Sequence, residues 1–206
     1  MLAQLVDPSR TAIVTQECQE AIVGRGAGLK DLAAEAQLVA IPNIARLLTA
    51  GRAAGVKVVH CTILRRPDGL GTNHNARIFA FGRSSNPDLT PDSPAAQILP
   101  ELGPEPSDVV LSRYHGMGPM AGTDLDIVLR NMGITTIVGV GVSVNVAITN
   151  FVMDAVNRAY DFVLPRDAVA GIPHDYAEAV IDNTLSLLTT LTTTDALIDV
   201  WAGARR

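Results

Sequence analysis

The sequence predicts an α/β protein in which a mostly parallel sheet lies between two layers of helices. Apolar runs of strand length alternate with segments of helical spacing along the chain. The runs 11–15, 56–64 and 134–140 are almost wholly apolar, which is typical of strands buried on both faces. The chain is also long enough to bury a substantial core. We therefore expect a three-layer α/β/α architecture.

The amino-acid composition limits the classes of molecule that the protein is expected to bind. The chain has 206 residues, 48% of them hydrophobic, and a formal net charge of −5. These values suit one domain over residues 1–206 rather than a disordered chain. Basic residues are scattered, so neither nucleic acid nor an anionic membrane is an expected partner. No apolar run has membrane-spanning length, residues 1–10 show no signal-peptide pattern, and two cysteines fit a reducing cytoplasm.

The first part of the chain is expected to supply two strands and a helix. The β-branched run 11–15 predicts the first strand, and the run 56–64 predicts the second. Apolar residues between these strands have helical spacing. Because proline favours the first turn of a helix, Pro42 predicts a helix from about Ile41 to Gly55.

Residues 65–106 interrupt the alternation. This stretch holds seven of the twelve prolines, and we expect a long excursion with one short helix at residues 95–99. Loops of this length in compact domains are usually functional or partly disordered. The excursion is therefore expected to be a lid, a contact between subunits or a partly disordered segment.

The second part of the chain resumes the alternation. Thr123 is expected to cap a helix that ends at Gly133. The expected strands are residues 108–112, 134–140, 161–164 and an edge strand at 191–194. The other expected helices end near Arg158, span 173–188 and close the chain at 195–201.

One turn is central to the expected site. The stretch Gly139-Val-Gly-Val-Ser-Val-Asn-Val-Ala-Ile-Thr-Asn150 follows an apolar strand and opens a helix. The first amides of such a helix have no intrahelical partner and carry the positive end of its dipole, so they suit an oxyanion or an anion. Ligand sites in parallel sheets lie at the carboxyl ends of strands. Glu17, Arg113 and the turn 141–147 all follow strands and should share that rim.

Several motifs occur in a specific order and spacing. They are Gly122-Thr-Asp-Leu125, Leu129-Arg-Asn-Met-Gly-Ile134, Val138-Gly-Val-Gly-Val-Ser-Val-Asn145, Met153-Asp-Ala155 and Pro165-Arg-Asp-Ala-Val-Ala-Gly171. In these motifs the chain resembles the isochorismatase-like hydrolases, which include nicotinamidases and N-carbamoylsarcosine amidases. The resemblance implies six strands in the order 3-2-1-4-5-6, a homodimer or homotetramer, and a non-proline cis peptide near residues 142–144.

The resemblance also implies an amidase triad, and this chain differs at all three positions. Glu17 stands in place of an Asp after the first strand, Arg113 in place of a Lys after the third, and Ala147 in place of the nucleophilic Cys. Ala147 cannot attack a carbonyl, so a thioester mechanism at that position is excluded. Arg113 stays protonated and can pair with Glu17 or with a substrate carboxylate.

Two functions remain open. The resemblance implies that true isochorismatases also lack the cysteine and act through the acidic residue without a covalent intermediate. One hypothesis is therefore a non-covalent hydrolase of a small molecule, with an anionic substrate as one option and Glu17 as acid or base. The alternative is a catalytically inactive member that binds a small molecule or serves as an assembly partner. The residues assigned to oxyanion or substrate binding are Ser143, Val144, Asn145, Gln19, Tyr114 and His115.

No cofactor and no metal are expected. The pair Gly139 and Gly141 lacks the third glycine and the acidic residue of a dinucleotide fingerprint. His60 lacks the Asp-x-His spacing with which, by the resemblance, nicotinamidases hold a metal, as does His74. The two cysteines, Cys18 and Cys61, are expected to pack as small hydrophobes.

Overall fold

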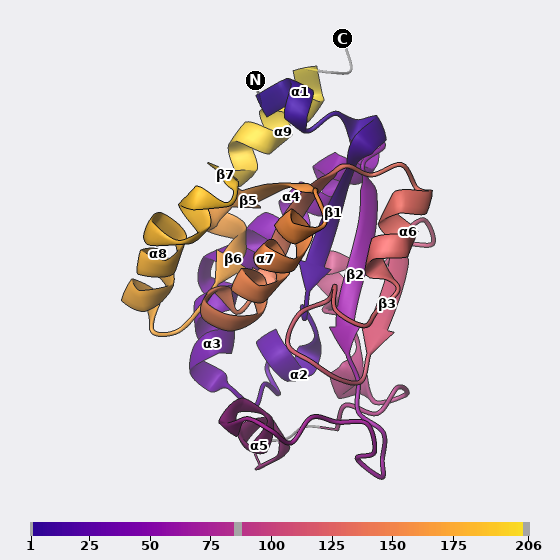
Figure 1. The fold of residues 1–206 in the computed structure, drawn as a ribbon, viewed down its shortest axis with the longest axis vertical. Coiled ribbons are helices and arrows are strands. Elements are labelled where there is room, and N and C mark those ends of the chain that lie inside the picture. Colours follow the sequence, from indigo (N-terminus) through magenta and orange to yellow (C-terminus); the bar gives the residue numbers. More distant parts are fainter. Residues whose placement is uncertain (1, 85–87, 204–206) are drawn as a thin grey trace.

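A computed structural model describes residues 2–84 and 88–203 and contains a parallel sheet of seven strands (Figure 1). Its order β3-β2-β1-β4-β5-β7 confirms the expected order, with β7 as the sixth strand of that series. A seventh strand, β6, has only two residues and pairs with β4, and so short a strand leaves no pattern in the sequence. The strands are β1 (Thr11–Gln16), β2 (Lys57–Ile63), β3 (Val109–Arg113), β4 (Thr136–Val142), β5 (Asp161–Pro165), β6 (Val169–Ala170) and β7 (Thr190–Thr192).

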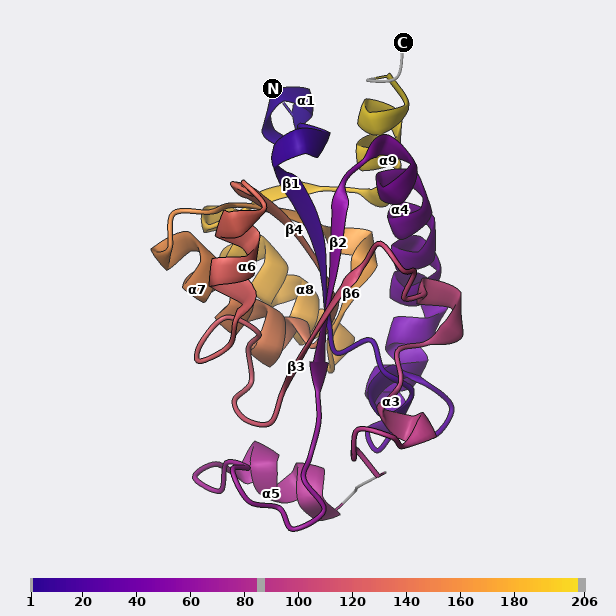
Figure 2. The same ribbon diagram turned by 90° about the vertical axis from the view of Figure 1, so that its right-hand side faces the viewer.

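Helices cover both faces of the sheet, which confirms the three layers. Seen edge-on, α6, α7 and α8 lie on one side of the sheet, and α3, α4 and α9 lie on the other (Figure 2). The helices are α1 (Leu2–Leu5), α2 (Glu20–Val23), α3 (Lys30–Glu35), α4 (Ile41–Ala54), α5 (Arg77–Ser84), α6 (Leu125–Asn131), α7 (Thr149–Asn157), α8 (His174–Asn183) and α9 (Thr194–Gly203).

The central strands are buried along their whole length. Every residue of β1 and of β4 is buried, as strands covered on both faces require. One apolar core lies against α4 and α9 and includes Ile44, Leu48 and Trp201. The other lies against α6, α7 and α8 and includes Leu129 and Phe151. The sheet is thus fixed from both sides, and its carboxyl rim is a stable platform.

The helix expected to begin at Ile41 begins eleven residues earlier. Residues 30–54 form one helical run, because a π-helical turn at Ala36–Ala40 joins α3 to α4. In that turn the Ile41 amide bonds to the carbonyl of Ala36, five residues back, and the following Pro42 has no amide to place. Burial of Ala36 and Ala40 in the core keeps the residues before the proline helical.

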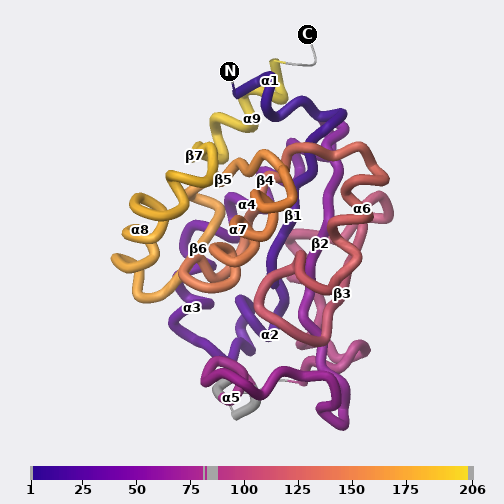
Figure 3. The backbone as a smooth tube through the Cα atoms, viewed as in Figure 1, coloured from indigo at the N-terminus to yellow at the C-terminus, as the bar shows by residue number. Residues whose placement is uncertain are grey.

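The excursion also differs from the expectation. A helix, α5, lies at residues 77–84, where none was predicted, and the predicted helix at 95–99 is a single 3₁₀ turn at Pro94–Ala96. The chain leaves the sheet after β2, passes through α5 at the far end of the molecule, and returns to β3 (Figure 3). Most residues of this stretch are polar turn formers with no regular periodicity. Its conformation therefore depends on contacts with the rest of the chain. Within the described residues, no helix has the length and apolar character needed to cross a membrane.

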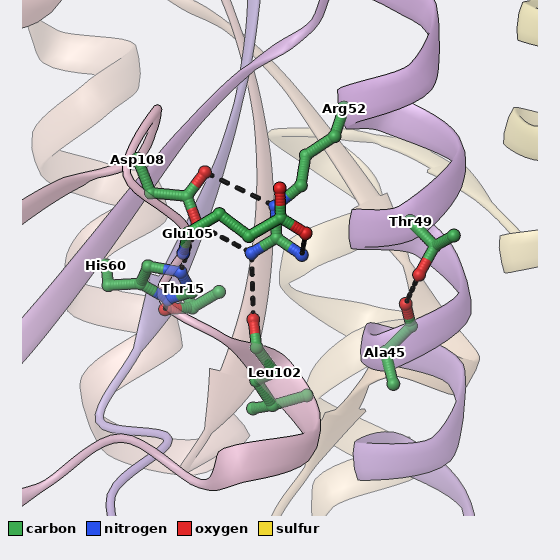
Figure 4. A network of polar contacts seen from close by, with 8 residues as sticks. All are labelled: Thr15, Ala45, Thr49, Arg52, His60, Leu102, Glu105 and Asp108. Carbon is green, nitrogen blue, oxygen red and sulfur yellow. Dashed lines mark hydrogen bonds and ion pairs between the residues drawn. The ribbon is translucent and has the colours of Figure 1, made fainter.

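A buried polar network joins β1, β2, α4 and the end of the excursion (Figure 4). The Thr15 hydroxyl lies 2.9 Å from Nδ1 of His60, and Nε2 of His60 lies 3.3 Å from the carboxylate of Asp108. Arg52 on α4 donates to Asp108 at 2.6 Å and to the carbonyl of Leu102 at 2.8 Å. The network therefore fastens the returning chain to the sheet.

The hydrogen-bond partners of His60 indicate which of its ring nitrogens carries the hydrogen. A carboxylate only accepts hydrogen bonds, so Nε2 carries the hydrogen, and Nδ1 accepts from Thr15. Burial lowers the pKa of His60, and the neighbouring Asp108 carboxylate offsets this only in part. Burial acts to raise the pKa of Asp108, but hydrogen bonds, chiefly from Arg52, outweigh it and lower that pKa. Burial therefore favours the neutral form of His60 in the folded protein.

We expect His60→Gln to reduce the free energy of unfolding at pH 7.5 by about 1–3 kcal/mol, because buried partners lose their hydrogen bonds. The unfolded chain binds a proton at His60 below about pH 6.5, while the folded chain resists it. Wild-type stability from this residue is thus lost as the pH falls below that value. The difference between wild type and variant should shrink from pH 7.5 to pH 5.5 in urea titrations.

His174→Gln is the matched control. The Glu35 carboxylate, 2.7 Å from the ring, raises the pKa of the exposed His174. Its stabilisation is present below about pH 6.5 and is lost as the pH rises through the folded pKa. The difference between wild type and this variant should therefore grow as the pH falls. Equal pH slopes in wild type and His60→Gln would contradict a neutral buried imidazole.

Candidate functional site

Glu17 lies at the carboxyl rim of the sheet, directly after β1. Its backbone is in the left-handed region, with φ of 53°, which is uncommon for a residue with a side chain. Its amide donates to the carbonyl of Cys61 at 2.9 Å, so β2 holds this turn in place. The side chain is 18% exposed. The fold therefore presents one carboxylate at the rim in a fixed position.

Arg113, the last residue of β3, reaches across the end of β2 to form an ion pair with Glu17. Its Nη2 donates to Oε1 of Glu17 and, at 3.1 Å, to the carbonyl of Met117. The guanidinium side chain is 3% exposed, and its Nε and Nη1 are buried with no hydrogen-bond partner among the described residues. Arg113 thus lies behind the carboxylate as its counter-charge.

The turn after β4 completes the rim. The peptide between Val142 and Ser143 is cis, within the stretch where the family resemblance places such a bond. A π-helical turn at Val144–Ile148 follows and leads into α7. Gly141, with φ of 113°, permits close approach to β1, because an added Cβ would lie 2.3 Å from the carbonyl oxygen of Gln16. The start of the turn is therefore close to Gln16, the residue before Glu17.

A pocket of about 200 Å³ opens above this rim. Its floor contains Glu17, Ser143 and Ala147, and its walls come from α2, the start of α3, the excursion with α5, and the loop after β3. The pocket is open: Met120 is buried in the core and does not line it, and Tyr114 and Met117 lie in its wall. The rim therefore has room for a small molecule beside the carboxylate.

The expected site residues divide into three groups. Glu17, Ser143, Ala147, Tyr114 and His115 line the pocket, whereas Arg113 touches it only through Glu17. The arginine is therefore placed to pair with the carboxylate, the first of its two expected partners, and not with a substrate anion.

Three other expected residues turn away from the pocket. Gln19 donates to the carbonyls of Ile63 and Ala96 at 3.0 and 2.7 Å, so it fastens the excursion to β2. The side chain of Val144 is buried in the core, and Asn145 donates to the carbonyl of Ile172 at 3.1 Å. These side chains have structural contacts, and none of the three residues lines the pocket. A ligand-binding role for the backbone amides of the turn stays a prediction.

Sequence reasoning missed the walls contributed by the excursion. Arg65, Thr72, Asn73, Ile78 and Phe79 all line the pocket. Asn73 accepts a hydrogen bond from the Gly116 amide at 2.8 Å, which links the excursion to the loop after β3. The only available signal was an apolar cluster, beginning with Ile78, inside a polar stretch.

The two thiols are poor nucleophiles. Cys18 and Cys61 are buried and unpaired with each other, and burial raises the pKa of each to about 12. In addition, no group of three or more His, Cys, Asp or Glu side chains suited to a metal ion occurs in residues 2–84 and 88–203. The ionisable chemistry on the pocket floor is therefore that of Glu17.

Comparison with known proteins places the chain among hydrolases. A curated relative, the ureidoacrylate amidohydrolase RutB of Rhizobium rhizogenes, is 30% identical over 188 residues, covering 83% of this chain and 74% of the relative. An N-carbamoylsarcosine amidase of Arthrobacter is 26% identical over 129 residues, covering 63% of this chain and 48% of the relative. The solved cysteine hydrolase of Pseudomonas syringae has a similar fold, with a TM-score of 0.84, 24% identity and coverage of 97% and 96%.

The family profile agrees with these relatives. The Isochorismatase domain matches residues 11–196, from the first residue of β1 into α9. This range contains every strand of the sheet and the whole rim with Glu17, Arg113 and Ala147. The chain therefore belongs to the isochorismatase family of hydrolases.

Proposed function

We propose that this chain hydrolyses a small molecule without a covalent enzyme intermediate, with Glu17 as the general base and acid. The proposal is supported by an open pocket whose floor pairs the Glu17 carboxylate with a helix-opening turn and includes Ala147, the residue that the family resemblance aligns with the nucleophile. The curated relatives are named as hydrolases of amide-type bonds, so amides are the first substrates to test.

The proposed step balances with water alone. Glu17 accepts a proton from water, and the resulting hydroxide adds to the carbonyl carbon of the substrate. In this proposal, backbone amides at the start of the turn after β4, where Ser143 and Ala147 line the pocket, stabilise the oxyanion. The carbon–nitrogen bond then breaks, and Glu17 returns the proton to the leaving nitrogen.

The ion pair supports this role for Glu17. Arg113 is the counter-charge of the carboxylate, and an arginine remains charged at all working pH values, so it cannot shuttle the proton itself. Within this ion pair, proton transfer is thereby assigned to Glu17. Because the left-handed backbone and the Arg113 contact fix Glu17, small displacements of its carboxylate should have large effects on the rate.

We expect Glu17→Gln to lower kcat/KM for any amide that the protein hydrolyses by about 100-fold or more, because the amide cannot transfer the proton. Its Oε1 can still accept from Arg113, so the fold should be retained, as circular dichroism would check. Glu20→Gln is the control, since Glu20 lies on α2 outside this pocket. Unchanged turnover in Glu17→Gln would exclude the mechanism, and no turnover of any amide by wild type would favour the inactive binder.

A second prediction concerns the position of Ala147. We expect iodoacetamide at pH 8 to leave the folded wild-type protein unmodified, because the pKa of both native thiols is about 12 and both are buried. Ala147→Cys should gain a single label at residue 147, since this side chain lines the open pocket. Mass spectrometry of tryptic peptides identifies the site.

Denatured wild-type protein is the control and should be labelled at both Cys18 and Cys61. Labelling of either native thiol in the folded chain at the rate seen for Ala147→Cys would overturn the conclusion that they are inert. It would also reopen the question of a substitute nucleophile.

A further inference from the structure

The pocket walls above Glu17 are largely apolar. Leu29 and Leu32 form part of one side, and Ile78 and Phe79 of α5 form part of another. Apolar side chains also reach the floor, where Val146 and Ala147 lie beside the carboxylate. A ligand that reaches the reacting position therefore contacts hydrocarbon over much of its length.

Several of these apolar walls are exposed to solvent. Leu29 is 40% exposed, Ile78 45% and Met117 38%, and all three line the same pocket. These segments lie far apart in the sequence and converge on one opening. Exposed apolar surface that is concave and gathered around polar groups is typical of a ligand site. The occupant that removes it from water must itself be apolar.

Among the residues that the structure describes, the pocket lining contains one carboxylate, Glu17, and one guanidinium, Arg65. Arg113 is buried behind Glu17 and contributes no surface to the pocket. The cation in the wall is Arg65, whose Nη2 donates to the carbonyl of Gly82 at 3.3 Å and so links the end of β2 to α5. A carboxylate on the substrate would also share the pocket with the carboxylate of Glu17.

We infer that the natural substrate carries an uncharged apolar substituent, aliphatic or aromatic, on its hydrolysable group. The reacting group lies on the floor at Glu17 and Ala147, and the substituent packs between the start of α3 and α5. This inference rests on the proposed function for the place of the reacting group, but the substituent is recognised by binding alone.

Binding of a series of primary amides tests the inference. Acetamide, butanamide and hexanamide are titrated by calorimetry into wild type and into Glu17→Gln. We expect affinity to rise by about fourfold for each added methylene in both proteins. Adipamate, which has the chain length of hexanamide and a terminal carboxylate, should bind more weakly than hexanamide.

Two results would overturn the inference: equal affinity along the series, or adipamate binding as tightly as hexanamide. Length-dependent binding without turnover would count against the proposed function and leave the inference standing. Turnover that is lost in Glu17→Gln, together with flat affinities, would support the function and reject the substituent. The two proposals therefore fail in different ways.

Variants of the exposed walls locate the substituent. Ile78→Gln and Leu29→Gln alter exposed side chains on opposite segments, so neither should disturb the core. Each should reduce the gain per methylene from about fourfold to less than about twofold. Ile127→Gln is the matched control, because Ile127 is 56% exposed on α6 and does not line the pocket, and it should keep the full gain. If both Ile78→Gln and Leu29→Gln kept the full gain in affinity per methylene, the proposed position of the substituent would be rejected.

Discussion

The ion pair between Glu17 and Arg113 is the contact on which the site depends. Its two residues end strands that are separated by β2 in the sheet, so only the order β3-β2-β1 brings them together. A guanidinium that is 3% exposed needs a counter-charge, because an unpaired buried charge costs several kcal/mol. The sheet order, the left-handed turn at Glu17 and the loop that offers the Met117 carbonyl all serve this one contact.

The same contact limits the chemistry of the pocket. Lysine can take up and release a proton when its surroundings shift its pKa, whereas arginine keeps its charge and acts as a planar hydrogen-bond donor. With Arg113 behind Glu17 and a methyl group at residue 147, the pocket floor offers one carboxylate, Ser143 and backbone amides. In the proposed mechanism the carboxylate acts on water and not on a nucleophilic side chain. The apolar walls would then contribute to binding and exclude bulk water, which strengthens electrostatic interactions on the floor.

The regular part of the fold could be predicted because its signals are local. The strands β1 and β4 are recognisable as apolar runs. The strand order came from the family resemblance, and the carboxyl ends of parallel strands place Glu17, Arg113 and the turn after β4 on one rim. Side-chain direction could not be predicted. Gln19 and Asn145 are polar residues near the rim, yet each is held by backbone carbonyls of a distant segment. The helical run through Pro42 could not be predicted locally, because a π-helical turn and the burial of Ala36 and Ala40 carry the helix past the proline. The helix α5 left only the apolar cluster that begins with Ile78 as a signal.

The candidate site differs from a second polar cluster in the same molecule in that it is accessible to solvent. Thr15, His60 and Asp108 place a hydroxyl, an imidazole and a carboxylate in a hydrogen-bonded chain, the order of groups found in nucleophilic hydrolases. Both Thr15 and His60 are fully buried, and Arg52 closes the chain from α4 (Figure 4). No substrate can reach that hydroxyl, so the groups join secondary-structure elements and nothing more. Glu17 is the reverse case, because its partner is buried while its own carboxylate faces an open pocket. The two networks thus differ in whether a reactive group meets solvent, which is why the proposed chemistry is assigned to the Glu17 rim and not to the His60 network.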